Sequence, residues 1–192
     1  MDGFQRRREQ KKQSILEAAL VLFMKHGIQK VSIAEIAKAA KVSQVTIYNY
    51  FESKHNLTHD TFIYYVDTAM DDFRNVLDAK IPFPEKIKTL IFKKKEAATQ
   101  IHDEFYQYIM SEYTKNHYFA KSYTEKAIPY LNELISEGKG QGYIDPNLSN
   151  EAISFYLNMF TDYLQREEVY QSILPLTEDI TNIFFYGLIG KR

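Results

Sequence analysis

Six side chains between positions 44 and 50 are of the types that read DNA. Amide, hydroxyl, phenol and small branched apolar groups contact base edges and phosphates. Ile47 and Phe51 lie four positions apart and can be buried on one helical face, which leaves the six on the outer faces. The spacing therefore predicts a short recognition helix that presents Gln44, Val45, Thr46, Tyr48, Asn49 and Tyr50.

Two capping signals predict the elements that position these residues. Ser32 and Glu35 form an S-x-x-E capping box, and Ser43 begins a second helix after only about two turns of the first. Ser53 and Lys54 begin a longer helix, whose N-terminal amides and ammonium suit a phosphate. These are the dimensions of a helix-turn-helix, so Ser32, Ser43 and Lys54 are also predicted DNA contacts. The alternative is a helical hairpin with a polar surface.

Residues 42–54, VSQVTIYNYFESK, resemble the recognition helix of the tetracycline-repressor (TetR) family and the turn after it. The resemblance covers about the first 57 residues and extends to that family's first helix. It implies a DNA-binding regulator with an effector pocket among the helices that follow. The upstream residues that carry it are Ala18, Ala19, Leu22, Phe23, Gly27 and Ile28.

Two positions depart from that pattern. Ala34 stands where some members carry a base-contacting arginine, so the first helix of the pair is expected to contribute phosphate contacts only. Val45 is bulkier than the small residue or proline often found at its position. The operator sequence therefore cannot be taken from a relative.

The composition favours an all-α fold. Hydrophobic residues make up 45% of the 192 positions, and Gly and Pro are few. The absence of cysteine excludes disulfides, thiolate metal sites and cysteine catalysis. We predict an N-terminal three-helix DNA-binding domain over residues 1–53, and a helical ligand-binding and dimerisation domain over residues 54–192.

The charge is divided between the two ends of the chain. Residues 1–54 hold ten Lys and Arg against five Asp and Glu, and the remainder holds fourteen against twenty. A basic end suits contact with phosphates at that end only. The basic residues at 6–12 form either a solvated arm or an arm that follows the DNA backbone. With no signal-peptide pattern and no long apolar run, a cytoplasmic protein without a membrane partner is expected.

Candidate catalytic and metal sites are weak. His55 and His59 are spaced as two ligands on one helix face, but no third ligand is evident and H-E-x-x-H is absent. Exposed polar residues explain them better. No G-x-S-x-G or other nucleophile motif occurs. We therefore expect no enzyme activity, no metal and no cofactor.

Aromatic residues exceed what a small helical core needs. Most are expected in the core, since aromatic residues at helical spacing usually are. A minority could line the effector pocket that the family resemblance implies, because tyrosine offers a large apolar face with a hydroxyl. The predicted pocket residues are Tyr65, Phe105, Tyr108, Tyr113 and Tyr156.

The last two predicted helices, one capped by Ser149 and one starting after Pro175, each carry an apolar stripe, and the last is apolar on more than one face. One subunit cannot bury all of that surface, so we predict a homodimer in which these helices form a four-helix bundle. The alternative is that they close the core of the monomer. The predicted interface residues are Ile153, Leu157, Phe160, Ile180, Ile183, Phe184, Gly187 and Leu188.

Together these patterns predict a dimeric repressor that binds a palindromic operator in double-stranded DNA. A small lipophilic or aromatic effector of unknown identity would release it, by binding the DNA-incompetent state better. The alternative is a regulator of the same fold that answers to a protein partner or acts as an activator. A third interpretation, less well supported by the motifs, is a helical enzyme or adaptor in which the helix-turn-helix is incidental.

Overall fold

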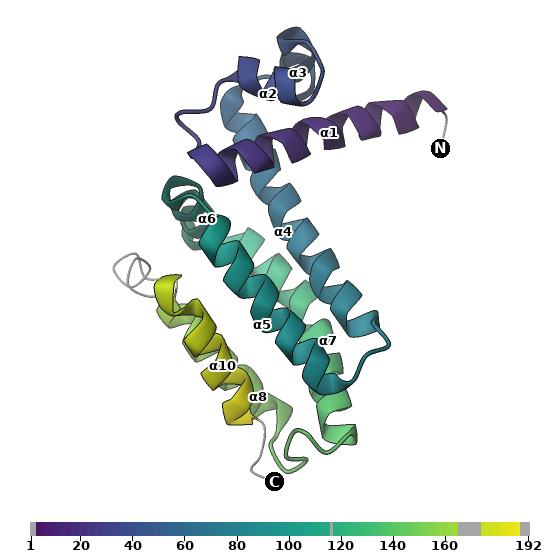
Figure 1. The fold of residues 1–192 in the computed structure, drawn as a ribbon, viewed down its shortest axis with the longest axis vertical. Coiled ribbons are helices and arrows are strands. Elements are labelled where there is room, and N and C mark those ends of the chain that lie inside the picture. The colour runs from purple at the N-terminus through teal and green to yellow at the C-terminus, as the bar shows by residue number, and fades with distance from the viewer. Residues whose placement is uncertain (1–2, 116, 165–173, 189–192) are drawn as a thin grey trace. The chain divides into compact units, whose positions relative to one another are not determined.

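The fold is all-α, as predicted. A computed structural model of the chain describes residues 3–115, 117–164 and 174–188, and no strand occurs among them (Figure 1). None of the described helices is long and apolar enough to cross a membrane. The elements are α1 (Gly3–His26), α2 (Ile33–Ala39), α3 (Gln44–Phe51), α4 (Lys54–Asp78), α5 (Phe83–Gln100), α6 (Asp103–Lys115), α7 (His117–Gly140), α8 (Asn150–Leu164), a 3₁₀ turn η1 (Leu174–Leu176) and α10 (Thr177–Leu188).

Helix α1 begins earlier than the sequence suggested. The basic residues at 6–12 were expected to form an arm, but they continue the helix that buries Ile15, Ala19 and Phe23. Gln, Arg, Glu and Lys are good helix formers, and no proline interrupts them, so the first turns join the helix already stabilised by packing. The helix ends where predicted, at Gly27, which adopts a left-handed φ of 79°.

Local capping fixes α2 and α3. Both halves of the capping box between Ser32 and Glu35 are present, and Ser43 caps α3 by accepting from the backbone N–H of Thr46. The turn between the helices places Lys41 at a φ of 56°, and the Val42 N–H donates to the Ala37 carbonyl at 2.9 Å. The predicted helix-turn-helix geometry is therefore confirmed.

The contacts divide the chain into two units. The N-terminal unit is residues 1–69 with 100–109, and the C-terminal unit is residues 70–99 with 110–192. Helix α4 runs without a break through residues 69 and 70, where the division falls. The predicted functional boundary between residues 53 and 54 stays a prediction.

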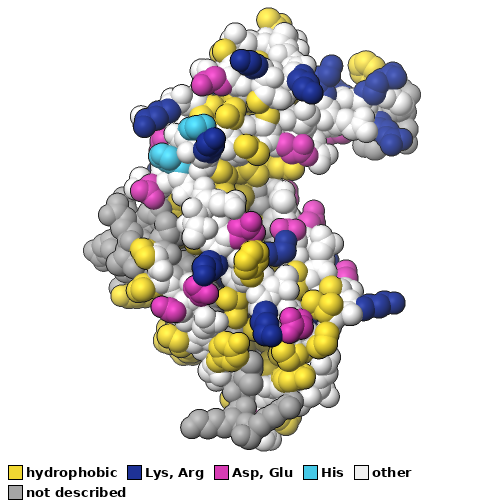
Figure 2. Space-filling view, viewed as in Figure 1, with side chains coloured by type: hydrophobic (Ala, Val, Ile, Leu, Met, Phe, Trp, Pro, Cys, Tyr) yellow, Lys and Arg dark blue, Asp and Glu magenta, His cyan; other side chains and the backbone are white. Residues whose placement is uncertain are grey.

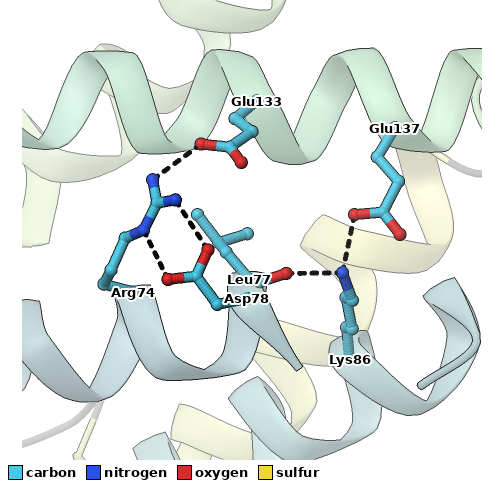
Figure 3. A network of polar contacts seen from close by, with 6 residues as sticks. All are labelled: Arg74, Leu77, Asp78, Lys86, Glu133 and Glu137. Atoms are coloured by element: carbon cyan, nitrogen blue, oxygen red, sulfur yellow. Dashed lines mark hydrogen bonds and ion pairs between the residues drawn. The ribbon is translucent and has the colours of Figure 1, made fainter. Parts of the chain in front are cut away.

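The core of the C-terminal unit joins α4, α5, α7 and α8. It includes Val76, Ile87, Leu90, Leu134 and Ile153. The buried Lys86 ammonium closes one edge, because it donates to the Leu77 carbonyl at 2.6 Å and to the Glu137 carboxylate at 2.8 Å (Figure 3). Beside it Arg74 donates to Asp78 and to Glu133 on α7. Polar side chains thus tie α4, α5 and α7 around the apolar centre.

Candidate nucleic-acid interface

Helix α3 exposes most of the side chains predicted to read DNA. Gln44, Val45, Tyr48 and Asn49 are exposed, and Thr46 and Tyr50 are half-buried. Val45 is 67% exposed and Tyr48 47%, although both are large and apolar. Only Ile47 and Phe51 on this helix are buried, in agreement with the predicted spacing.

The three serine caps hold the helix starts in place. The Ser32 hydroxyl and backbone N–H both donate to the Glu35 carboxylate at 2.7 Å, which lowers the pKa of Glu35. The hydroxyls of Ser43 and Thr46 lie 2.8 Å apart, and Ser53 accepts from the Asn56 N–H at 3.1 Å. Ser32 and Ser43 remain exposed, so a phosphate can still approach them.

Tyr50 was predicted to face outward, but its side chain is half-buried and contacts α1. Its hydroxyl donates to the Arg8 carbonyl at 3.3 Å, and the Arg8 guanidinium carbon lies 5.9 Å from its ring centroid. Lys12 lies 5.7 Å from the Phe51 ring centroid and pairs with Asp60 at 3.0 Å. The end of α3 therefore fastens the basic part of α1. An open recess of about 420 Å³ between them is lined by Gln5, Arg8, Glu9, Lys12 and Tyr50.

Basic side chains gather at the N-terminal end of α1, where Figure 2 shows them as dark blue atoms. Arg6, Arg7, Arg8 and Lys11 are all exposed there. Lys54, the predicted phosphate contact, is half-buried at the start of α4, and its ammonium lies 3.4 Å from the Gln29 carbonyl. That contact is long for a hydrogen bond, so Lys54 remains available to a phosphate.

The start of α6 is tied to the turn between α1 and α2. The His102 N–H donates to the Met24 carbonyl at 2.7 Å, and the Gln29 N–H donates to the Glu104 carboxylate at 3.0 Å. Gly27 allows this approach, since a Cβ there would lie 2.8 Å from the His102 ring. No sequence signal pointed to these contacts, because Gln29 and Glu104 are 75 positions apart and Met24 and His102 are still farther apart.

The residues predicted to line an effector pocket do not form one group. Tyr65 and Tyr108 are half-buried in the N-terminal unit, and burial raises the pKa of Tyr65. Phe105 has no exposed surface, because it packs between Phe23 and Tyr65 with ring centroids 6.0 Å apart in both cases. Phe105 is therefore a core residue, which corrects its assignment to the pocket. Tyr156 is half-buried on α8 of the C-terminal unit. The Tyr113 side chain lies outside the described residues.

One predicted interface residue is also corrected. Ile153 is only 2% exposed and belongs to the core of its own chain. The exposed stripe of α8 lies on another face and consists of Phe155, Met159 and Tyr163. On α10, Ile183 and Gly187 are exposed and Ile180 is half-buried. The side chains of Leu157, Phe160, Phe184 and Leu188 lie outside the described residues.

The histidines of α4 do not build a metal site. His59 Nδ1 lies 4.0 Å from a carboxylate oxygen of Asp60. Across the described parts of the chain, no three His, Asp or Glu side chains are grouped so that they could hold a metal ion.

Known proteins match this chain at the level of sequence and of fold. Residues 15–60 match the family described as bacterial regulatory proteins, tetR family. The uncharacterized HTH-type transcriptional regulator YuxN of Bacillus subtilis is 27% identical over 172 residues, which cover 71% of this chain and 55% of YuxN. The HTH-type transcriptional regulator LuxR of Vibrio harveyi is 30% identical over 80 residues, covering 42% and 39%. The chain thus spans about half the length of such relatives.

Two solved structures share the fold. A transcriptional regulator from Saccharomonospora viridis, in complex with choline, gives a TM-score of 0.66 at 18% identity, with 96% of this chain and 100% of that chain covered. The fatty acid degradation regulator FadR from Bacillus halodurans gives 0.58 at 23% identity, with 94% and 97% covered. At these identities the likeness establishes the fold alone.

Proposed function

The chain belongs to the tetR family of bacterial regulatory proteins, and we propose that it is a dimeric transcriptional repressor that a small molecule releases from its operator. The family consists of transcriptional regulators and not of enzymes. Two large apolar side chains of α3 that stay exposed, Val45 and Tyr48, carry the proposal.

Val45 and Tyr48 have a clear use in the major groove. A helix of this size enters the groove with its N-terminal residues against the base edges. There Val45 can contact a thymine methyl group, Gln44 and Asn49 can bond adenine, and Tyr48 can reach bases or phosphates. Large apolar groups kept exposed on a well-packed helix support contact with a partner at that face.

The surrounding groups suit the phosphate backbone. Lys54 and the amides at the start of α4 lie beside α3, and the α1 extension adds Arg6, Arg7 and Lys11. Such contacts strengthen binding to every sequence and make it salt-dependent. We assign Tyr50 a positioning role, since it holds the Arg8 segment of α1 against the end of α3.

Point variants test these roles on operator DNA obtained by selection from random sequences. Lys54→Ala should weaken binding to all sequences and lower the salt slope by about one. Gln44→Ala or Asn49→Ala should relax preference at particular base pairs, by about 1–3 kcal/mol for a bidentate contact. Lys121→Ala, 76% exposed on α7, is the charge-matched control and should change neither property. Equal loss on all sequences from Gln44→Ala would contradict base reading by that residue.

Two copies are needed for a palindromic operator, because one helix-turn-helix makes few contacts. The exposed stripe of α8, with Ile183 and Tyr186 on α10, supports an interface between copies at these helices. Met159→Glu should give monomers in sedimentation and weaken operator binding. Phe92→Glu is the control, since Phe92 is also a large exposed side chain but lies on α5. A dimer that survives Met159→Glu would place the interface elsewhere.

Release by an effector would act through linkage. An effector can lower operator affinity by no more than the factor by which it binds the DNA-incompetent state more tightly than the DNA-competent state. Helix α4, which continues from the recognition region into the C-terminal unit, supports such coupling. A thermal-shift screen should find small molecules that stabilise the free protein and weaken operator binding. Ligands that bind free and DNA-bound protein equally would argue against release.

A further inference from the structure

Helix α5 carries five lysines, and one of them differs from the others. Four form ion pairs: Lys86 with Glu137 at 2.8 Å, Lys88 with Glu85 at 2.8 Å, Lys93 with Asp72 at 2.9 Å, and Lys95 with Glu178 at 2.6 Å. Among the residues that the structure describes, Lys94 has no such carboxylate partner.

The neighbours of Lys94 show which way it faces. Lys93 reaches α4 on one side of α5, and Lys95 reaches α10 on the other, in keeping with the positions of these helices in Figure 1. Lys94 lies between them, within about 20° of the buried Ile87 around the helix axis at about 100° per residue. Ile87 belongs to the core shared with α7 and α8. Lys94 therefore continues the inward face of α5, one turn beyond Leu90 and Ile91.

Lys94 is nevertheless accessible to water. Its side chain is exposed, whereas Ile87, Leu90 and Ile91 on the same face are buried. The surrounding protein still desolvates the amine and lowers its pKa. Since the inward face of α5 is open to water at Lys94 but closed at Leu90 and Ile91, the packing of the C-terminal unit leaves space beside Lys94. An ammonium ion in such a place is unfavourable unless an anion joins it.

We propose that Lys94 binds the negatively charged group of the effector, and that the effector is an amphipathic organic anion. The role of this anion as the effector rests on the proposed function, whereas the anion site at Lys94 does not depend on it. The apolar body of such a ligand would lie against the turns beyond the core. On α8 the half-buried Tyr156 lies one turn after Ile153 of that core. A cationic effector would be repelled by Lys94.

Three ligands with one chain length and different headgroups test the charge preference. Dodecanoate, dodecanol and dodecyltrimethylammonium are titrated into the full chain by calorimetry, below the concentrations at which they aggregate. 1-Anilinonaphthalene-8-sulfonate serves as an aromatic anion. The wild-type protein should bind at least one of the two anions, at least about tenfold more tightly than dodecanol and the ammonium compound. Binding of neither anion, or equal binding of all headgroups, would overturn the proposal.

Variants of α5 test the residue. Lys94→Met should abolish the preference for the anion and leave dodecanol binding unchanged, whereas Lys94→Arg should retain the preference. Lys88→Met is the matched control, because it removes the same charge from an exposed site on the same helix. Anion binding by Lys94→Met as tight as that of the wild type would refute the assignment.

Melting curves test whether Lys94 has a structural role instead. Removal of a desolvated charge that lacks a partner should leave the melting temperature of Lys94→Met unchanged or higher. A clearly lower melting temperature would mean that Lys94 already has a carboxylate partner in the chain, which would also overturn the proposal.

Operator binding separates this inference from the proposed function. If the anion binds through Lys94 and weakens operator binding, both are supported. If it binds through Lys94 and the operator complex is unaffected, the anion site stands and release by this ligand fails. If release is caused by neutral or cationic ligands only, and Lys94→Met responds normally, the repressor stands and the Lys94 site fails.

Discussion

The N-terminal and C-terminal units are stabilised by interactions of different range. Around α2 and α3, each helix start is closed by a serine within three positions, and the exposed face follows from the short apolar pattern. In the C-terminal unit, lysines of α5 reach carboxylates on α4, α7 and α10. The first arrangement fixes the starts of α2 and α3 by contacts within each helix. The second leaves Lys94 of α5 facing inward, which suits the anion site proposed above.

The largest effect should come from the aromatic contact that joins α6 to α1 and α4. Phe105→Ala removes a fully buried ring that touches Phe23 and Tyr65, and should destabilise the protein by about 3–5 kcal/mol. Denaturant unfolding measures this loss. Phe92→Ala, which removes a ring that is 63% exposed, should stay within about 0.5 kcal/mol. Similar losses from both would remove the contrast between core and surface aromatics.

The next effect tests the polar ties of the C-terminal unit. Lys86→Met removes a buried ammonium and leaves the Leu77 carbonyl and the Glu137 carboxylate without that partner. Because Glu137 keeps some contact with water, we expect a loss of about 2 kcal/mol in unfolding free energy. Lys88→Met breaks an exposed pair on the same helix and should cost less than about 1 kcal/mol. If Lys86→Met left the free energy of unfolding unchanged, apolar packing alone would hold α4, α5 and α7 together.

A smaller loss is expected at the turn between α1 and α2. Gly27→Ala places a Cβ on a residue with a φ of 79°, against the His102 ring and the Glu104 carboxylate. The cost should be about 1–2 kcal/mol, measured by thermal unfolding. Gly140→Ala, at the end of α7 with open space where its Cβ would lie, should be neutral or slightly stabilising. If both glycines tolerate alanine, the close approach of α6 is not required.

The smallest effect concerns pH and the capping box. Hydrogen bonds from Ser32 hold the pKa of Glu35 below its ordinary value of 4.5. The stability that this lowered pKa confers is fully present above pH 4.5 and is lost as the pH falls through the lowered pKa. Glu35→Ala should therefore be less stable than wild type at neutral pH, and the difference should shrink in acid. A difference that stays constant with pH would exclude the carboxylate as its source.

Local sequence patterns predicted the recognition helix because every signal for it lies within a few positions. They could not predict that Tyr50 would bond Arg8, 42 positions away, or that α1 would extend to meet it. On α8 the periodicity identified one apolar stripe, yet only the tertiary packing places Ile153 in the core and leaves Phe155 exposed. Lys94 likewise differs from its neighbouring lysines only through the helices around it.

The link between Gln29 and Glu104 has a consequence for synthesis on the ribosome. The family match ends at residue 60, but the amide of Gln29 finds its carboxylate only when residue 104 has left the exit tunnel. The Met24 carbonyl likewise accepts its hydrogen bond only once His102 has been made, and Phe23 packs on a ring only once Phe105 has been made. A nascent chain of about 60 residues can form its short capped helices, yet it cannot complete the packing beneath them. The packing beneath α2 and α3 is therefore complete only after α5 and the start of α6 have been made.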